Sequence, residues 1–391
     1  MFASLARLCR ILLPLVAGLA AGAALAADDT LPPLRYGPIP DFLLWTQPQR
    51  EVGYRNYEKL YTTAPVARGT RVHPLRKAAR EIVVEFDHAG QHMNVDSFME
   101  SGKLSGLLIM KDGEILLERY RAGMTADQRW TSFSVAKSVT STLVGAAVHD
   151  GYIKSIDDPV TRYIPQMKGS AYDRVSVRQL MMMASGIRWN EDVFDFNSDY
   201  MKLFSGDFIA PMMDRPQIHP AGSTFHYNTA DTNLVGTLVM QATGKPLSTY
   251  LSEKIWAPYG MEKDAAWLLV NGKETGGACI SMTLRDYGRF GEFIREGAMI
   301  DGKPVVPDGW IADATSSHIA TGWGDVGYGY LWWVNKDKTF RALGVFGQFI
   351  FVDIPNKIVI VGLGAWDKPE DEVRYQAEDA FIAAVEKTLA K

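Results

Sequence analysis

The chain of 391 residues contains little cysteine and no surplus of basic residues. Two cysteines are too few for a disulfide framework or for most thiolate metal sites. With 41 basic and 45 acidic residues the formal net charge is −4, which argues against a polybasic nucleic-acid-binding protein. Hydrophobic residues make up 47% of the chain and charged residues 22%, a balance typical of a folded globular protein. The length is sufficient for a large core and for two or three lobes.

Motifs of several common chemistries are missing or misplaced. The sequence contains no H-E-x-x-H and its seven histidines are scattered, so a zinc site has little support. No G-x-S-x-G occurs either. One G-x-G-x-x-G is present at Gly322, Gly324 and Gly327, but it leads into an expected strand, whereas a dinucleotide site needs a strand before the glycines and a helix after them. We interpret this stretch as a turn-rich loop and expect no metal site.

The first 26 residues have the pattern of a signal peptide. Arg7 and Arg10 precede an apolar run over 11–24, and the run ends in Ala24-Leu25-Ala26, the small-residue pattern of a cleavage site. A membrane anchor is the alternative, but the run is short for a bilayer span and contains proline and glycine. We therefore expect cleavage, a mature chain of net charge −6 with one cysteine, Cys279, no stable membrane insertion, and a location in the bacterial periplasm or outside the cell.

Apolar periodicity and turn residues predict an α+β fold. Asp112-Gly113 between two apolar runs is a strong hairpin signal, because both residues tolerate positive φ. Glycines at the ends of apolar helical patterns mark helix C-termini. The expected helices cover 134–149, 175–184, 231–242, 281–291 and 370–389, and the expected strands cover 106–110, 115–120, 328–335, 347–353 and 357–363.

This order of elements predicts an antiparallel sheet flanked by helices, with an inserted, mostly helical lobe. We expect the sheet lobe to comprise about 86–150 and 276–391, and the helical lobe about 151–275. Residues 27–85 are rich in proline and aromatic side chains, so we expect an N-terminal extension that lies in extended form over another lobe. The domain proper then runs from 86 to 391.

A candidate nucleophile lies at the start of the helix over 134–149. Ser134-Val135-Ala136-Lys137 is the one S-x-x-K in the chain, although composition alone predicts about one such match by chance. Positions i and i+3 share a helix face, so the lysine amine can reach the serine hydroxyl. The free N–H groups of the helix N-terminus favour a developing alkoxide, and burial would lower the pKa of the lysine. A surface serine and lysine at a helix start remain the alternative.

A candidate acid or base lies in a loop before the helix over 231–242. Tyr227 occurs in Phe225-His226-Tyr227-Asn228-Thr229, and a neighbouring ammonium group would lower the pKa of such a tyrosine. Taken alone, a loop tyrosine is more often a packing residue.

Together these segments resemble the serine β-lactamase and penicillin-recognising superfamily, in particular its class C-like branch and the 6-aminohexanoate-dimer hydrolases within it. The resemblance covers roughly residues 90–385, and many pieces occur in the family's order. Besides Ser134-x-x-Lys137 and Tyr227, the matching stretches are 157–160, 163–165, 177–180, 185–186, 220–222, 227–232, 276–281 and 344–348.

The resemblance implies a serine hydrolase that forms an acyl-enzyme and needs no metal or organic cofactor. Ser134 would be the nucleophile, Lys137 its activating partner and Tyr227 the second acid/base group. The backbone N–H groups of Ser134 and Val345 would form the oxyanion hole, where each donor can supply about 3–4 kcal/mol of transition-state stabilisation. The implied partner is a small ester or amide substrate, and no nucleic acid.

The chain departs from the β-lactamase pattern at two places. The family's Y-x-N, whose asparagine binds the substrate amide, has Thr229 at its third position here, with Asn228 one place earlier. The family's Lys-Thr-Gly, which binds the substrate carboxylate, is missing, and Arg341 in Arg341-Ala342-Leu343-Gly344 is the nearest positive charge. Both departures favour an esterase or small-amide hydrolase over an efficient β-lactamase.

The segment from Trp189 to Tyr200 is rich in aromatic and acidic residues, and it is a candidate wall of the substrate cleft. Trp189, Asn228 and Arg341 are therefore candidate substrate-binding residues. A solvated loop pinned by its aromatic residues is an equal alternative. A second function also remains open, namely a non-hydrolytic penicillin-binding-like protein that binds cell-wall peptide or a protein partner.

Overall fold

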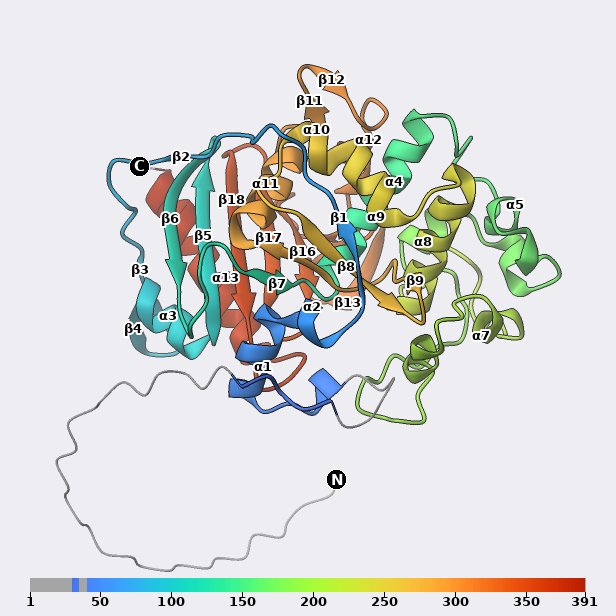
Figure 1. Cartoon of the computed structure of the whole chain (residues 1–391), viewed down its shortest axis with the longest axis horizontal. Coiled ribbons are helices and arrows are strands. Elements are labelled where there is room, and N and C mark those ends of the chain that lie inside the picture. Colours follow the sequence, from blue (N-terminus) through green and yellow to red (C-terminus); the bar gives the residue numbers. More distant parts are fainter. Residues whose placement is uncertain (1–29, 35–40, 391) are drawn as a thin grey trace, which may run out of the picture.

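The computed structural model describes residues 30–34 and 41–390, and the signal peptide expected over 1–26 lies outside these residues. In the described part the chain folds into two β-sheets, two short hairpins and thirteen α-helices, and the predicted α+β class is confirmed. Figure 1 shows the helical lobe, coloured green to yellow, beside the strands of the large sheet. No helix in these ranges is long and apolar enough to span a bilayer.

The large sheet is built mainly from strands near the start and near the end of the domain predicted over 86–391. Its strands are β2 (Arg76–Lys77), β5 (Leu104–Lys111), β6 (Glu114–Tyr120), β13 (Ile319–Trp323), β14 (Val326–Tyr328), β15 (Trp333–Val334), β16 (Phe340–Gly344), β17 (Gln348–Asp353) and β18 (Ile358–Gly364). Among the described residues their spatial order is β13-β14-β15-β16-β17-β18-β5-β6-β2. Neighbours are antiparallel except β2 and β6, which are parallel. The predicted hairpin over 106–120 is the β5–β6 pair.

The central strands separate two cores because successive side chains point to opposite faces of a sheet. In β18, Ile358 and Ile360 enter one core, and Val359 and Val361 enter the other. The first core is covered by α3 (Val95–Ser101) and α13 (Glu372–Leu389). The second faces α4 (Val135–His149) and α11 (Leu284–Arg295), which position the candidate nucleophile.

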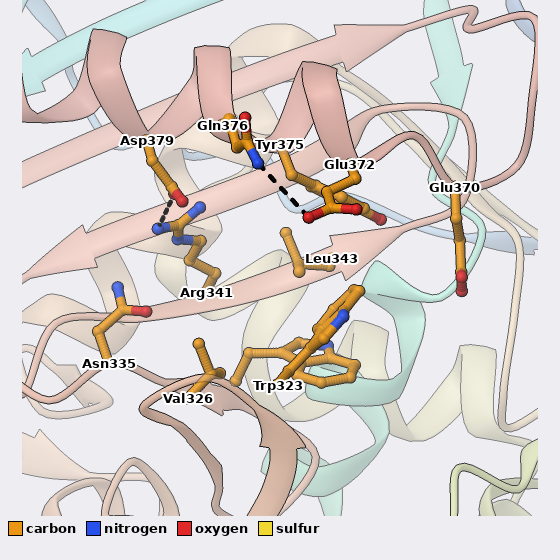
Figure 2. A pocket seen from close by; sticks show the side chains of 11 residues that line it. Trp323, Val326, Asn335, Arg341, Leu343, Glu370, Glu372, Tyr375, Gln376 and Asp379 are labelled. Carbon is orange, nitrogen blue, oxygen red and sulfur yellow. Dashed lines mark hydrogen bonds and ion pairs between the residues drawn. The ribbon is translucent and has the colours of Figure 1, made fainter. Parts of the chain in front are cut away.

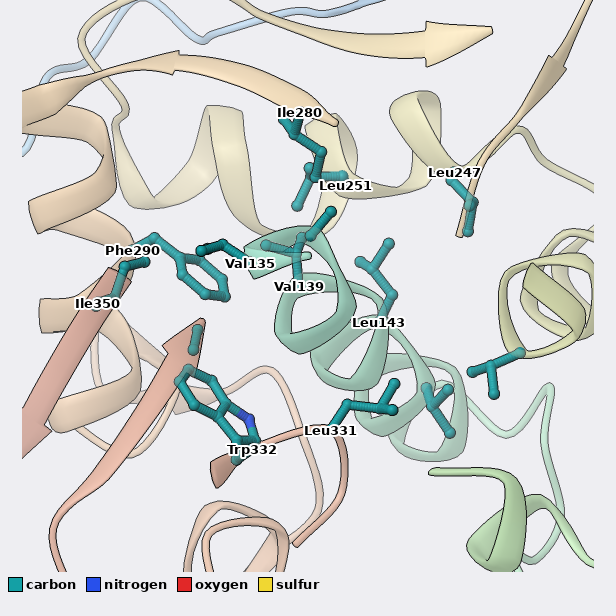
Figure 3. Close-up of a cluster of buried hydrophobic side chains, with 14 of the residues drawn as sticks. Val135, Val139, Leu143, Leu247, Leu251, Ile280, Phe290, Leu331, Trp332 and Ile350 are labelled. Carbon is teal, nitrogen blue, oxygen red and sulfur yellow. The ribbon is translucent and has the colours of Figure 1, made fainter. Parts of the chain in front are cut away.

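Helix α4 lies in the middle of the molecule, with every residue over 135–147 buried. Figure 3 shows Val135, Val139 and Leu143 of this helix among side chains from several surrounding elements. A helix that is buried on all sides is a core helix. Its N-terminus, where Ser134 lies, is therefore held rigidly by packing on every side.

The helical lobe packs against α4, chiefly through α8. Its helices are α5 (Val160–Tyr163), α6 (Val177–Met181), α7 (Ala210–Met213), α8 (Thr229–Thr243), α9 (Leu247–Leu251) and α10 (Ala257–Tyr259). Helix α8 begins where Asn228 accepts a hydrogen bond from the Asp231 amide, and it ends at Gly244 with φ +70°. The C-terminal end agrees with the predicted glycine stop, whereas the helix begins two residues before the predicted start at Asp231 because Asn228 caps it.

The second sheet places the N-terminal extension in the core. It contains β1 (Thr63–Val66), β7 (Arg129–Thr131), β8 (Ala265–Val270), β9 (Lys273–Glu274) and β10 (Ile280–Thr283). The expectation of an extended segment over 27–85 is wrong for α1 (Gln47–Arg55) and α2 (Tyr57–Leu60), which are helices. Burial of their aromatic side chains explains the difference, because Tyr54 and Tyr57 lie in the main core.

Other elements differ from the sequence expectation in their bounds. The stretch 328–335 is split between β14 and β15, and β16 was not expected. The helix expected over 281–291 begins only at Leu284, after β10, where the Thr283 side chain caps it. Gly324 and Asp325 form the turn between β13 and β14, and Gly322 lies in β13 where the register of the strand pair shifts, so the predicted turn-rich loop is a hairpin. The remaining elements are the hairpins β3 (Glu85–His88)–β4 (Gln91–Asn94) and β11 (Met299–Ile300)–β12 (Lys303–Pro304), and α12 (Trp310–Ala314).

Candidate active site

Ser134 is presented by a constrained turn between β7 and α4. It is the residue immediately before the first turn of the helix. The preceding residue, Phe133, has φ +44°, a conformation that non-glycine residues rarely adopt. The Phe133 ring is buried, and its centroid lies 5.2 Å from that of Phe42 and 4.9 Å from that of Tyr54. This packing holds the unusual backbone in place and fixes the direction of the Ser134 side chain.

Lys137 lies one helical turn after Ser134 and is 2% exposed. Its Nζ is 2.9 Å from Ser134 Oγ, 3.1 Å from Thr229 Oγ1 and 2.8 Å from the Gly277 carbonyl oxygen. The spacing i, i+3 therefore brings together the two residues that the sequence motif paired. The amine has no further partner among the described residues, so its hydrogen-bonding capacity is used entirely within the site.

The environment of Lys137 favours a neutral amine. Burial lowers the pKa of Lys137 from its ordinary value of 10.5 to about 8, although the negative charge of Glu191 opposes this change. A lysine with a pKa near 8 is partly deprotonated at neutral pH. It can therefore accept a proton from a hydroxyl group within hydrogen-bonding distance.

Tyr227 lies beside Lys137, two residues before α8. Lys137 Nζ is 5.0 Å from the centroid of its ring, and the ring stacks on Trp333 at 5.9 Å. Burial raises the pKa of Tyr227, and a hydrogen bond with Ser134 only partly offsets this effect. The phenol therefore keeps its proton at neutral pH and can donate it. The structure brings Ser134, Lys137 and Tyr227 together.

The end of β16 brings a second free amide beside that of Ser134. A Cβ added to Gly344 would lie 2.4 Å from the Ser132 carbonyl oxygen and 3.3 Å from the Ser134 nitrogen, so only glycine allows this approach. Val345 follows, and it lines the same cavities as Ser134. Within the described chain, neither the Ser134 amide nor the Val345 amide donates a hydrogen bond. Two unpaired N–H groups thus lie together next to the serine hydroxyl.

Sequence reasoning missed the roles of Thr229 and Glu191. Thr229 was noted only as a departure from Y-x-N, but its hydroxyl contacts Lys137 Nζ and hydrogen bonds to Glu191. Glu191 also accepts hydrogen bonds from the Thr229 amide, at 3.0 Å, and from the Trp189 indole. Thr229 could have been found from its place two residues after Tyr227, where the family's Y-x-N motif has a functional side chain. Nothing in the sequence connects Glu191 with Lys137 beyond its place in the acidic segment.

The three candidate substrate-binding residues lie elsewhere. Trp189 is 4% exposed and lies beneath Glu191, outside the lining of the cavities at Ser134. The Asn228 side chain is buried at the start of α8, where it caps the helix. Arg341 lies in a more distant cavity and forms an ion pair with Asp379 at 2.5 Å. The structure does not bring these three side chains to Ser134.

Two cavities meet at Ser134. The first, here called the inner cavity, has a volume of about 410 Å³. The second, here called the loop cavity, has a volume of about 360 Å³ and extends toward the segment 191–194, so that Glu191, Val193 and Phe194 line it as the sequence suggested. The residues that line both are Ser134, Glu191, Tyr227, Val345 and Glu370.

The inner cavity continues into an outer cavity of about 420 Å³, shown in Figure 2. Trp323, Trp333, Leu343, Glu370 and Tyr375 line both the inner and the outer cavity. In Figure 2, Tyr375 and Glu372 project from α13, Trp323 lies on the opposite side, and Arg341 reaches Asp379 at the far end.

The charge of the inner cavity is acidic. Glu191 and Glu370 are its charged side chains, and none of the described residues lining it is basic. Glu370 forms no ion pair or hydrogen bond in the part of the chain that the structure describes. Trp323, Trp333 and Tyr375 surround the approach to it, with ring centroids 5.2 Å and 5.5 Å apart for the Trp323–Trp333 and Trp323–Tyr375 pairs. Aromatic faces and a carboxylate together suit an uncharged or cationic ligand.

Residues 93–385 match the family model described as Beta-lactamase. The chain is 28% identical over 362 residues to the 6-aminohexanoate-dimer hydrolase of Paenarthrobacter ureafaciens, an alignment that covers 85% of this chain and 90% of that protein.

Solved structures of low sequence identity share the fold. A Bacillus anthracis protein named provisionally as a 6-aminohexanoate-dimer hydrolase superposes with a TM-score of 0.78 at 22% identity, over 88% of this chain and 95% of that one. A D-stereospecific amidohydrolase from Streptomyces gives a TM-score of 0.57 at 16% identity, over 72% and 98%.

Proposed function

The chain belongs to the beta-lactamase family of serine hydrolases, and we propose that it cleaves an ester or small amide through an acyl-enzyme on Ser134. The observation that carries the proposal is the buried amine of Lys137, 2.9 Å from the Ser134 hydroxyl and with a pKa lowered to about 8. Such an amine can act as a general base near neutral pH.

In the acylation step, Ser134 Oγ attacks the substrate carbonyl carbon while its proton passes to Lys137 Nζ. The carbonyl oxygen becomes an oxyanion, which the free amides of Ser134 and Val345 would bind. The tetrahedral intermediate then collapses, and the bond to the leaving oxygen or nitrogen breaks. Tyr227 donates its phenolic proton to the leaving group and regains a proton from the Lys137 ammonium.

The assignment of acid and base rests on the opposite pKa shifts of the two groups. The pKa of Lys137 is lowered and that of Tyr227 is raised, both chiefly by burial. Burial disfavours the charged form of each side chain, so the phenol is neutral in the resting enzyme and a fraction of the amine, which grows as the pH approaches 8, is neutral too. A neutral amine accepts a proton and a neutral phenol donates one. This favours Lys137 over Tyr227 as the general base.

In the deacylation step, water attacks the acyl carbon and gives a proton to Lys137. The ester bond to Ser134 Oγ breaks, the acid product leaves, and Ser134 takes back the proton from the Lys137 ammonium. No group other than Ser134, Lys137 and Tyr227 has to change its protonation state. The cycle returns the enzyme to its starting form.

The cavity walls support a substrate without a free carboxylate near the scissile bond. Glu191 and Glu370 would repel an anionic substrate, and the one arginine of the outer cavity is already paired with Asp379. The name of the Paenarthrobacter relative points to an amide of an amino acid that carries a free amine at one end and a carboxylate at the other, remote from the amide bond. We propose a neutral or amine-bearing ester or amide, and poor turnover of β-lactams.

The proposed function is tested by labelling the mature protein with a fluorophosphonate, which reacts with an activated serine. We expect the wild type to be labelled and Ser134→Ala to remain unlabelled. Tyr227→Phe, which keeps the ring that stacks on Trp333, should lower turnover of a p-nitrophenyl ester by about 100-fold or more. A wild type that takes no label would instead favour the alternative, a non-hydrolytic protein that binds cell-wall peptide.

We also propose that the protein is exported and acts in the periplasm or outside the cell, from the signal pattern over 1–26. Fractionation of a bacterium that expresses the full chain, followed by N-terminal sequencing, tests this. An N-terminus at Ala27 in the periplasmic fraction would support the proposal, and an uncleaved chain in the cytoplasm would contradict it.

A further inference from the structure

Glu191 does not contact Lys137, but Thr229 connects the two. The Thr229 hydroxyl lies 3.1 Å from Lys137 Nζ and also hydrogen bonds to Glu191 Oε1. The other carboxylate oxygen, Oε2, accepts hydrogen bonds from the Thr229 amide, at 3.0 Å, and from the Trp189 indole. Glu191 belongs to the loop between α6 and α7, and Thr229 is the first residue of α8.

This chain of hydrogen bonds has a fixed direction. An ionised carboxylate can only accept, so the Thr229 O–H points to Glu191 and the Thr229 oxygen accepts from Lys137. The Gly277 carbonyl, 2.8 Å from Lys137 Nζ, is also an acceptor only. A neutral amine has two N–H groups and one lone pair. Thr229 and Gly277 take the two N–H groups, and the lone pair is left facing Ser134 at 2.9 Å.

We propose that Glu191 is a positioning residue which, by fixing the Thr229 hydroxyl, directs the lone pair of Lys137 toward Ser134. This inference rests on the proposed function, because it assigns the direction of a proton transfer from Ser134 to Lys137. It also explains why the position two residues after Tyr227, the third of the family's Y-x-N motif, can be threonine. A threonine hydroxyl at this position can accept a hydrogen bond from the lysine amine while it donates one to an acidic residue, and its orientation then depends on that acidic residue. An asparagine at the same position would not need the acidic residue.

Glu191 has a second effect through its charge. Its negative charge stabilises the Lys137 ammonium that forms when Ser134 loses its proton, and it raises the pKa of Lys137 against the effect of burial. Burial raises the pKa of Glu191 itself, but Lys137 and the donors from Thr229 and Trp189 oppose this. The ammonium therefore favours the charged form of the carboxylate, and the carboxylate favours the charged form of the amine, in the acylation step.

The variant Glu191→Gln reverses the direction of this series of hydrogen bonds while preserving the shape of the side chain. Two N–H donors point to the Oε2 position, so the glutamine oxygen must occupy it, and its NH₂ group then faces Thr229. The Thr229 hydroxyl would accept from this NH₂ group and become free to donate to the lone pair of Lys137. Ser134 would then lose its proton acceptor.

Glu191 also lines both cavities, so a direct contact with substrate has to be separated from the positioning role. The test uses the rate at which a fluorophosphonate labels Ser134, measured over about pH 6 to 10. In this reaction a bond forms between Ser134 Oγ and phosphorus, fluoride leaves, and the serine proton passes to Lys137. The variants are Glu191→Gln, Thr229→Val, Thr229→Ser and the Glu191→Gln/Thr229→Val double mutant.

We expect Glu191→Gln and Thr229→Val each to lower the labelling rate by roughly 10- to 100-fold. We expect the double mutant to be no slower than the slower single mutant, because both changes remove the same link. Thr229→Ser keeps the hydroxyl and should remain within about threefold of the wild type. In Glu191→Gln the acidic limb of the pH profile should move to lower pH, because Lys137 loses the charge that raises its pKa.

Asp308→Asn is the matched control, because Asp308 is an exposed acid outside the three cavities and should label like the wild type. Multiplicative losses in the double mutant, an unmoved pH profile in Glu191→Gln, or a Thr229→Ser variant as slow as Thr229→Val would each overturn the positioning role. Failure of the proposed function looks different, since the wild type would then take no label or Ser134→Ala would still be labelled.

Discussion

The rings of Phe133 and Phe346 pack with their centroids 5.6 Å apart, and both residues have positive φ, +44° and +67°. Phe133 directly precedes Ser134, and Phe346 directly follows Val345. One aromatic contact therefore joins the two backbone segments that carry the proposed oxyanion-hole amides. Tyr54, from the N-terminal helix α1, contacts both rings, at 4.9 Å and 5.9 Å.

This relationship predicts that Tyr54→Ala weakens both stability and reactivity. The ring is fully buried, and removing a large buried aromatic side chain costs about 3–5 kcal/mol. Because the cavity opens beside Phe133 and Phe346, we expect the rate of ester hydrolysis to fall in the protein that remains folded. Denaturant unfolding and turnover of a p-nitrophenyl ester measure the two effects.

Tyr54→Phe is the control for this prediction, because it keeps the ring. We expect it to change the free energy of unfolding by less than about 1.5 kcal/mol and to leave turnover close to that of the wild type. If Tyr54→Ala lost stability but kept full turnover per folded molecule, the aromatic cluster would not position the amides.

The pKa of Lys137 predicts how activity depends on pH. With a pKa of about 8, the amine is protonated below that pH and cannot accept the Ser134 proton. We expect kcat/KM for a neutral ester to rise with pH and to level off above about 8. Lys137→Met should lower kcat/KM by about 10²–10⁴-fold and abolish this limb. If kcat/KM of Lys137→Met still rose with pH over the same range, another group would be the general base.

The close approach of β16 to Ser134 predicts a specific effect of Gly344→Ala. The new Cβ would lie 2.4 Å from the Ser132 carbonyl oxygen, so the end of β16 must move away from the helix N-terminus. We expect turnover to fall by about 10-fold or more, because an oxyanion-hole donor would be displaced. Comparing turnover with the melting temperature separates this effect from unfolding, and wild-type turnover in Gly344→Ala would contradict the proposed role of Val345.

Glu378 predicts a pH dependence of stability that is independent of catalysis. The side chain is 3% exposed, its Oε1 has no hydrogen-bond partner among the described residues, and burial raises its pKa from 4.5 to about 8. Between these two values the folded protein holds a proton that the unfolded chain has released. The free energy of unfolding should therefore fall as pH rises from about 4.5 to about 8.

Glu378→Gln removes one of the groups that titrate in this range and should make the fall in stability with pH less steep. We expect the variant to gain stability over the wild type at pH 8 and to gain less at pH 6. Denaturant midpoints of both proteins at the two pH values test the prediction. If the free energy of unfolding changed equally with pH in the wild type and in the variant, a group other than Glu378 would be responsible for the pH dependence.

The sequence predicted the parts of the site that depend on local spacing. Ser134 and Lys137 are one helical turn apart, and Tyr227 lies in a loop whose following helix was recognisable from its apolar pattern and glycine stop. The hairpin β5–β6 was likewise predicted from Asp112-Gly113 and its flanking apolar runs. Short-range geometry follows directly from sequence in these cases.

The missed parts depend on contacts that are distant in sequence. Strand β16 carries Arg341 on an otherwise apolar segment and is recognisable only from its pairing with β15 and β17. Asn228 was expected to bind substrate, but its side chain caps α8, which is the ordinary role of asparagine at that position. Glu191 meets Thr229 only because the loop and α8 pack together. No local pattern records such contacts.

The charge of the inner cavity predicts which substrates the enzyme prefers. Glu370 lines all three cavities and has no partner in the described chain, and aromatic rings surround the approach to it. An ammonium group on the substrate would be attracted by the Glu370 carboxylate and by the faces of the aromatic rings, whereas a substrate carboxylate would be repelled by Glu370. We therefore expect kcat/KM for an amine-bearing ester to exceed that for its acetylated analogue. Nitrocefin, which carries a carboxylate, should be turned over more slowly than a neutral ester.

Glu370→Gln distinguishes this explanation from a general preference for small esters. The variant should lower kcat/KM for the amine-bearing ester by about 10-fold and leave that for the acetylated analogue within about twofold, because only the first interacts with the charge. Added salt should weaken the preference of the wild type in the same direction. An equal loss for both substrates would instead mean that Glu370 shapes the cavity without recognising charge, and nitrocefin turnover as fast as that of the neutral ester would contradict the acidic-cavity argument altogether.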